Sequence, residues 1–230
     1  MQGAEIKLPV VTPALARILP FALFMGFIIA GSLLPEAREW AGWDLRHLFT
    51  LRAAAVLVLL AIFWPRYTEL HKVALNRWQT ALAVFSGLVV FLLWINLDFP
   101  WATFGETKAF DPSGVDGGID WMLVEFRLLG LALVVPVMEE LFWRSFLMRW
   151  IDRQDFMQLS PGNVSPRAVT VSSLLFASEH QLWLAGLIAG FVYGLLYKRT
   201  GNLWVPLISH ATTNALLGAW ILATGNWQFW

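Results

Sequence analysis

Residues 135–144 read VPVMEELFWR and place two adjacent carboxylates, Glu139 and Glu140, inside a long apolar run. An ionisable side chain at bilayer depth costs at least ~2.5 kcal/mol on insertion scales. Two adjacent carboxylates therefore need partners that stabilise them. Those partners must come from nearby turns of the same helix, from other helices, or from water.

The surrounding chain has the composition of a membrane protein. It has 230 residues, of which 58% are hydrophobic and 14% are charged, whereas a soluble domain carries about a quarter charged residues. Its apolar runs predict an all-α, polytopic membrane protein with about seven transmembrane helices, six or eight being the alternatives. The predicted helices cover residues 14–34, 48–64, 79–95, 121–150, 166–180, 183–197 and 205–224.

Charge and cysteine content exclude other classes of partner and site. The net charge is zero and there is no basic tract, so nucleic acid is not an expected partner. The absence of cysteine excludes disulfides and thiolate metal sites. We divide the single membrane domain into an N-terminal region, 1–120, with three spans and an acidic non-cytoplasmic loop, and a C-terminal core, 121–230, built from the last four helices.

The distribution of Lys and Arg predicts the orientation in the membrane. These residues gather in segments 65–78, 144–167 and 198–199, and cytoplasmic loops carry such an excess. The N-terminus is therefore predicted to be cytoplasmic, and loop 96–120 and the C-terminus to lie outside. Arg17 and Arg52 are near the ends of predicted spans, where a long side chain can snorkel to water.

Polar side chains away from the helix ends show which groups need partners. Glu140 precedes Arg144 by four residues, the better orientation for an ion pair on a helix. Glu139 has no base at helical spacing, so it must meet another helix or water. Pro136 removes a backbone hydrogen bond, which frees the carbonyl of Ala132 and loosens the helix beside the two acids.

Two further pairs share a helical face because they are four residues apart: Phe176 with His180, and His210 with Asn214. A carboxylate near imidazole is suited to activate water as a general base. Glu139, His180 and His210 would equally be a zinc ligand set with one open position. A metal-free site would use His210 and Asn214 as oxyanion donors. These residues leave both alternatives open.

Other hydrolytic motifs are missing from the sequence. There is no His-Glu-x-x-His, no Gly-x-Ser-x-Gly and no cysteine, so water is the remaining nucleophile. Gly186, Gly190 and Gly194 recur every four residues on the sixth helix, which predicts close packing against a neighbouring helix.

The polar residues resemble the motifs of a known family, the CAAX-prenyl-protease-like intramembrane proteases. This superfamily includes type II CAAX endopeptidases and bacteriocin-processing and self-immunity proteins. The resemblance covers about residues 121–224 and rests on three motifs on successive helices, Glu139-Glu140-x-x-x-Arg144, Phe176-x-x-x-His180 and His210-x-x-x-Asn214.

The resemblance implies an intramembrane endopeptidase. In such an enzyme Glu139 and His180 would activate water, and His210 and Asn214 would stabilise the oxyanion. Three residues would be supporting structure: Glu140, Arg144 and Phe176. We expect a metal-independent reaction without a cofactor, with zinc on Glu139, His180 and His210 as the alternative.

The expected substrate is a membrane-associated protein or peptide cut near its C-terminus. The expected location is the bacterial cytoplasmic (inner) membrane, with the lipid bilayer as a partner and the site open to the cytoplasm. Glu179 is outside the motifs and is expected at the outer surface, where the fifth helix ends, with a role in orienting His180 as the alternative. The alternatives are a non-catalytic immunity or assembly factor of the same fold and a proton-coupled transporter. No inverted repeat supports a transporter.

Overall fold

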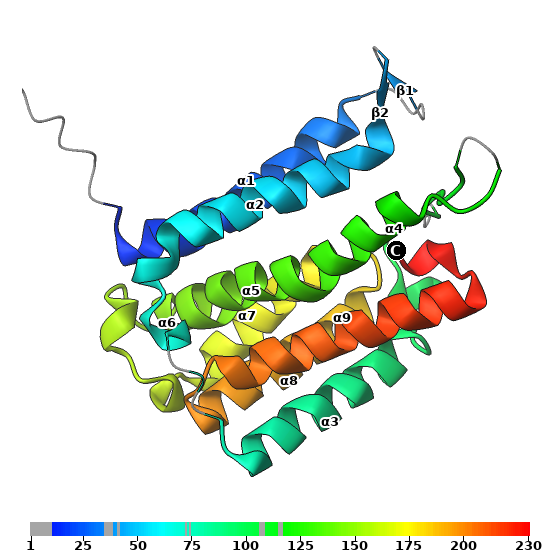
Figure 1. The fold of residues 1–230 in the computed structure, drawn as a ribbon. Helices are drawn as coiled ribbons and strands as arrows, with labels where there is room; N and C mark the ends of the chain where they lie inside the picture. The colour runs from blue at the N-terminus through cyan, green and yellow to red at the C-terminus, as the bar shows by residue number, and fades with distance from the viewer. Residues whose placement is uncertain are drawn as a thin grey trace, which may run out of the picture.

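The computed structural model describes residues 11–34, 39–40, 42–71, 73, 75–105, 109–114 and 117–230. Within these residues, seven long helices form a bundle (Figure 1). Six are α1 (Pro13–Ser32), α2 (Leu48–Phe63), α3 (Arg77–Trp94), α7 (Pro166–Ser178), α8 (Trp183–Thr200) and α9 (Trp204–Thr224). The seventh, Trp121–Trp150, is continuous through α4 (Trp121–Leu129), the π-helical segment η5 (Gly130–Val134), α5 (Val135–Glu139), the π-helical segment η6 (Glu140–Leu147) and α6 (Met148–Trp150).

The predicted all-α membrane fold is confirmed, and each helix ends within a turn of its predicted limits. Five helical stretches are long and apolar enough to cross a membrane: Pro13–Ser32, Leu45–Arg66, Arg77–Trp94, Trp121–Trp150 and Trp204–Thr224. The chain is therefore an integral multi-pass membrane protein. The α7 helix has 13 residues, fewer than the ~20 that a perpendicular crossing needs.

The remaining regular structure is short. Strands β1 (Glu39–Trp40) and β2 (Trp43–Asp44) pair antiparallel after α1. Single 3₁₀ turns are η1 (Leu45–His47), η2 (Trp64–Arg66), η3 (Thr68–Leu70), η4 (Pro100–Ala102), η7 (Phe156–Gln158), η8 (Pro161–Asn163) and η9 (Trp227–Phe229).

Local sequence explains where several helices begin and end. The Ser165 hydroxyl accepts a hydrogen bond from the Ala168 N–H, and Pro166 takes the first helical position of α7, where no N–H is needed. Asn76 and Gln79 cap α3 reciprocally. The α8 helix ends at Gly201, whose φ of 65° is left-handed and suits glycine.

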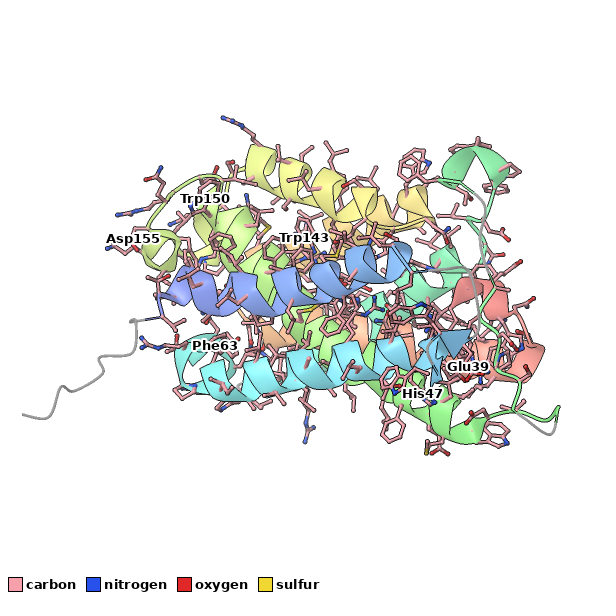
Figure 2. The ribbon with its side chains drawn as sticks, turned by 90° about the horizontal axis from the view of Figure 1, so that it is seen from above. Glu39, His47, Phe63, Trp143, Trp150 and Asp155 are labelled. Atoms are coloured by element: carbon pink, nitrogen blue, oxygen red, sulfur yellow. The ribbon has the colours of Figure 1, made fainter. Side chains whose placement is uncertain are left out.

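The helices pack in pairs that bring distant segments together. Helix α1 lies along α2, α3 along α9, and α7 along α8, while α8 also contacts α3 and α9 (Figure 1). Figure 2 shows Glu39 and His47 at one end of the bundle, Trp150 and Asp155 at the other, and Trp143 between them. We call these the Trp121 end, where α3 and α9 finish and α4 begins, and the Asp155 end.

Arg17 is buried in an ion-pair network, so the prediction that it snorkels is wrong. Its side chain is 0% exposed, pairs with Glu69 and donates from Nε to the Ser145 hydroxyl at 2.8 Å. Arg149 also pairs with Glu69, at 3.4 Å. Burial tends to raise the pKa of Glu69, but the Arg17 charge, the Ser145 hydrogen bond and Arg149 outweigh it and hold that pKa below its usual value. The network fixes α1 against η6 and α6 near the Asp155 end.

Candidate active site

Pro136 places a π-helical segment just before the two acidic residues. In η5 the hydrogen-bond register has moved by one residue, so that Val135 N–H donates to the Gly130 carbonyl. In that register the carbonyl left without a donor by Pro136 is that of Leu131, because proline has no N–H. The Asn214 amide donates to this carbonyl at 2.8 Å. The carbonyl freed by Pro136 is thus that of Leu131 rather than of Ala132, and α9 supplies its partner.

Glu140 forms the predicted pair with Arg144 and also binds His210. One oxygen, Oε1, is 3.2 Å from Arg144 Nη1 and 3.0 Å from His210 Nδ1. Since an ionised carboxylate only accepts hydrogen bonds, His210 donates from Nδ1 and presents Nε2 on the opposite side of its ring. Glu140 is fully buried, so this one carboxylate orients both the guanidinium and the imidazole.

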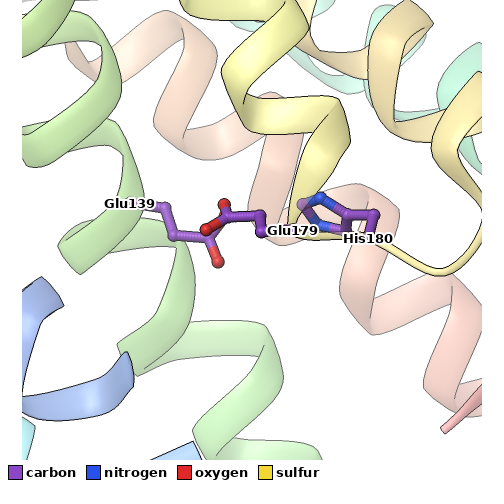
Figure 3. A group of neighbouring side chains, drawn as sticks. All are labelled: Glu139, Glu179 and His180. Carbon is purple, nitrogen blue, oxygen red and sulfur yellow. The ribbon is translucent and has the colours of Figure 1, made fainter. Parts of the chain in front are cut away.

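Glu139 faces two residues from the end of α7. One ligand atom from each of Glu139, Glu179 and His180 lies within 4.8 Å of the other two, and the three side chains converge in Figure 3. His210 Nε2 is 3.9 Å from Glu139 Oε2, an oxygen that is buried and has no hydrogen-bond partner among the described residues. An uncompensated buried acceptor is a place where a bound water would be stabilised.

The end of α7 fixes the tautomer of His180. Its Nδ1 lies 2.7 Å from the Phe176 carbonyl, and a carbonyl can only accept, so Nδ1 carries the proton. The other nitrogen, Nε2, therefore has a free lone pair that can bind a proton or a metal ion. The Phe176 ring packs on His180 with centroids 4.5 Å apart and lies 4.4 Å from the Arg144 guanidinium carbon. Because Phe176 and His180 are four residues apart, His180 contacts both the ring and the backbone carbonyl of Phe176.

Glu179 does not face the outer surface, and that prediction is wrong. Its Oε1 accepts a hydrogen bond from Trp143 Nε1 at 3.0 Å, which directs the carboxylate toward Glu139. The reason is that α7 stops at Ser178, so the 100° separation of adjacent helical side chains no longer applies to Glu179 and His180. The only signal in the sequence was the position of Glu179 beside His180.

His210 is held on its other face by a tyrosine that the sequence did not single out. The Tyr193 ring stacks on the imidazole at a centroid distance of 4.9 Å. Its hydroxyl donates to Thr213 Oγ1 at 2.8 Å, and Thr213 donates to the Gly87 carbonyl of α3. This chain of contacts fixes the orientation of His210 from three helices.

These side chains line one cavity of ≈ 320 Å³, which is bounded by Glu139, Glu179, His180, His210 and Asn214 among others. All four residues predicted to be catalytic therefore lie around one space. The packing of the helices brings these residues together although they are far apart in the chain. Glu139 and Asn214, the two most distant, are separated by 75 positions.

A second cavity of ≈ 410 Å³ connects this site with the surface. The two cavities share Glu179 and His180, and the second one reaches the exposed residues Asp98, Gln181 and Gln228. Those residues lie at the Trp121 end. The cavity therefore opens on the same side as loop 96–120. The sequence predicted that this loop is non-cytoplasmic and that the site opens to the cytoplasm, and these two predictions cannot both hold.

The glycines of α8 allow α7 to approach closely, as predicted. A Cβ at Gly190 would lie 3.0 Å from Ser173 Cα, and one at Gly186 would lie 3.1 Å from His180 Cβ. At Gly194 the nearest atoms would be at 3.5 Å, an ordinary van der Waals contact. The close contact at Gly186 is therefore directly behind the imidazole of His180.

Gly186→Ala is expected to displace His180 and to lower the expected peptidase activity by roughly tenfold or more, because a small shift of a residue predicted to be catalytic is costly. Gly194→Ala is the matched control, and we expect it to retain activity. The measurement is kcat/KM at equal amounts of folded, detergent-purified protein. Equal activity of Gly186→Ala and the wild type would contradict a role for this contact in positioning His180.

The donor atoms at the site are chemically suited to a metal ion. Two carboxylates and a ring nitrogen of His180 form the only group of three or more potential ligands that the described residues bring this close. Oxygen and imidazole donors are ligands that zinc accepts. The set differs from the one expected from the sequence, since Glu179 takes the place of His210.

Comparison with known proteins identifies the region that carries these residues. Residues 121–216 match the family model described as type II CAAX prenyl endopeptidase Rce1-like. No curated protein and no solved structure matches the chain. The matched segment contains Glu139, Glu140 and Arg144, the end of α7, and His210 with Asn214. Residues 121–216 are therefore similar to the Rce1-like type II CAAX prenyl endopeptidase family, as the three motifs indicated.

Proposed function

We propose that this membrane protease is an endopeptidase in which Glu139 activates water against a peptide bond of a membrane-associated protein or peptide. The observation that carries the proposal is the convergence of Glu139, Glu179 and His180 on one cavity that reaches the surface. The match of residues 121–216 to this family model supports a CAAX-type protease. The water-activation chemistry and the substrate are our inference.

In the proposed reaction a water lies between Glu139 and His180. Glu139 takes one proton from it as the oxygen attacks the scissile carbonyl carbon. Two groups donate hydrogen bonds to the oxyanion: the protonated Nε2 of His210 and the second amide N–H of Asn214. When the C–N bond breaks, protonated Glu139 returns its proton to the leaving nitrogen. The products are one free carboxyl and one free amine.

Glu179 gives this mechanism a second carboxyl group near the reacting water. Two close carboxylates in a buried site do not ionise together without a cation between them, so one of them tends to keep a proton. We propose that the two carboxyl groups share one proton and that Glu139 acts as the base while the proton is on Glu179. Glu140, Arg144 and Phe176 then act as support by fixing His210 and His180.

The reaction is proposed to be metal-independent. A zinc ion on Glu139, Glu179 and His180 would supply Lewis-acid activation of water, and the donor set fits it. We favour the metal-free version because each group already has a role without an ion. Glu139 is the base, Glu179 shares a proton with it, and the imidazole of His180 lies beside the reacting water.

The proposed orientation follows the Lys and Arg excess, which places the N-terminus in the cytoplasm and the C-terminus outside. The site would then open to the non-cytoplasmic side, since the cavity opens at the Trp121 end. We propose the bacterial inner membrane as location, and a substrate cut near its C-terminus as partner. A non-catalytic immunity or assembly role remains the second candidate, because the same fold can be retained without turnover.

The metal question has a direct test on purified, active protein. We expect cleavage of a mixed library of hydrophobic decapeptides to persist after EDTA treatment, and elemental analysis to find less than stoichiometric zinc. Stoichiometric zinc with cleavage that EDTA abolishes and zinc restores would overturn the metal-free version and keep the protease assignment. Absence of cleavage with and without added zinc would favour the non-catalytic role.

A further inference from the structure

Two arginines in the membrane-spanning helices have no counter-ion among the residues that the structure describes. Arg52 of α2 and Arg127 of α4 form no hydrogen bond or ion pair there, and the Nε of each is buried without a partner. Three other arginines within these helices behave differently: Arg17, Arg144 and Arg149 each pair with a glutamate. Arg52 and Arg127 are thus not accounted for by internal ion pairing.

Aromatic rings hold the two guanidinium groups close to one another. The Phe49 ring contacts both, with the Arg52 carbon Cζ 4.9 Å and the Arg127 Cζ 4.8 Å from its centroid. Phe24 lies 4.0 Å from the Arg52 Cζ, and Phe110 lies 4.4 Å from the Arg127 Cζ. Cation–π contacts compensate part of the desolvation. They do not supply the negative charge that two neighbouring cations lack.

The same cavity that contains the catalytic residues reaches this arginine pair. Arg52 and Arg127 line the ≈ 320 Å³ cavity together with Glu139, His180 and His210. Two unpaired cations in a low-dielectric interior cost more than an anion-bound pair. The described residues do not supply the missing anion, and an anion bound by the pair would lie in the cavity that leads to the site of hydrolysis.

We propose that Arg52 and Arg127 bind the C-terminal carboxylate of the substrate. The inference rests on the proposed peptidase function and deepens it. A bound C-terminal carboxylate would determine which peptide bond of the substrate lies beside Glu139. Guanidinium groups bind carboxylates in a bidentate manner with charge-assisted hydrogen bonds. A phospholipid headgroup offers similar chemistry, but the continuity of this cavity with Glu139 and His180 favours the substrate.

The helix that carries Arg127 also carries Glu139 and sets the length of the bound segment. The two residues are twelve positions apart, which is about 18 Å at the α-helical rise. Both side chains lean toward the N-terminus of the helix, so the separation of their functional groups along the axis is similar. An extended peptide covers this length in about five residues at ~3.3 Å each. We therefore expect the substrate to be cleaved roughly four to six residues from its free C-terminus.

The test compares two decapeptide libraries that differ only in ending in a free carboxylate or in an amide. With the wild-type protein, mass spectrometry should find cleavage four to six residues from the acid terminus. The amide library should be cleaved roughly 10- to 100-fold less efficiently. Arg52→Gln and Arg127→Gln should each reduce this acid preference by at least tenfold, mainly through KM. Arg77→Gln, at an exposed arginine, is the matched control and should keep it.

A binding measurement separates this inference from the peptidase proposal. The Glu139→Gln variant, alone and combined with Arg52→Gln or Arg127→Gln, is incubated with both libraries, and retained peptides are counted by mass spectrometry. We expect retention of the acid library that the arginine substitutions remove, whether or not the wild type hydrolyses it. Equal retention of both libraries, or retention of neither, overturns the carboxylate site.

Lipid binding is the named rival outcome. If the arginine substitutions lower the retention of phosphatidylglycerol relative to phosphatidylcholine, with no difference between the acid and amide libraries, the pair is a headgroup site and the proposal fails. Unfolding temperatures provide the folding control. Removal of an unpaired cation should leave them unchanged or higher, and a large decrease together with an unchanged acid preference would show a structural role instead.

Discussion

Glu139→Gln is expected to lower kcat/KM for peptide cleavage by about 10²- to 10⁴-fold, the contribution of a positioned general base. Glutamine is nearly isosteric with glutamate but cannot accept the proton of the attacking water. His180→Ala is expected to have a loss of similar size, because it removes the imidazole that lies close to Glu139. Both are measured as cleavage of hydrophobic decapeptides at matched amounts of folded protein.

The control for Glu139→Gln lies on the same continuous helix. Glu125 is a glutamate on the exposed face of α4, so Glu125→Gln removes the same charge without touching the cavity. It should keep wild-type kcat/KM. Full activity of Glu139→Gln or His180→Ala would eliminate the proposed mechanism. Glu179→Gln separates the two carboxylates: a smaller loss than for Glu139→Gln is expected if Glu139 is the base.

Arg144→Met is expected to destabilise the fold by about 3–5 kcal/mol, because breaking a buried ion pair leaves an uncompensated charge. Glu140 is 0% exposed and would then have only His210 to stabilise it. The double variant Glu140→Gln, Arg144→Met removes both charges and should recover a large part of the lost stability. Denaturant unfolding of the detergent-purified protein measures each variant.

Arg153→Met is the matched control for this experiment, since Arg153 is exposed on the connection after α6. Its effect should stay within ~0.5 kcal/mol. If Arg144→Met and Arg153→Met unfold at the same denaturant concentration, the Glu140–Arg144 pair does not support the fold. If the double variant is no more stable than the single one, the cost of Arg144→Met arises from lost packing on Phe176 and Tyr193 rather than from charge.

The sequence predicted most of the fold because the signals that define membrane helices are local. Apolar run length fixed seven helices to within a turn of their observed ends, and Ser165 with Pro166 marked the start of α7. The Glu140–Arg144 pair was also local, since both residues are on one turn of one helix. Four-residue spacing of glycines in α8 predicted a close helix contact for the same reason.

The parts that failed depend on contacts between helices or on the end of a helix. Glu179 was expected at the surface because periodicity cannot tell that α7 stops at Ser178 and turns both of its next side chains inward. Arg17 was expected to snorkel because its partner Glu69 is far away in the chain. Pro136 predicted a freed carbonyl, but which one is freed depends on the π-helical register of η5.

The sequence by itself determined the helical membrane fold, the three motifs and Arg144 as the partner of Glu140, since hydrophobic length and helical spacing are properties of short segments. Only the tertiary structure decided that Glu139 faces Glu179 and His180, that the cavity opens at the Trp121 end, and that Arg52 and Arg127 meet around Phe49. The physical reason is that a costly group in a membrane is satisfied by whichever helix packs against it, and packing partners are set by the whole bundle.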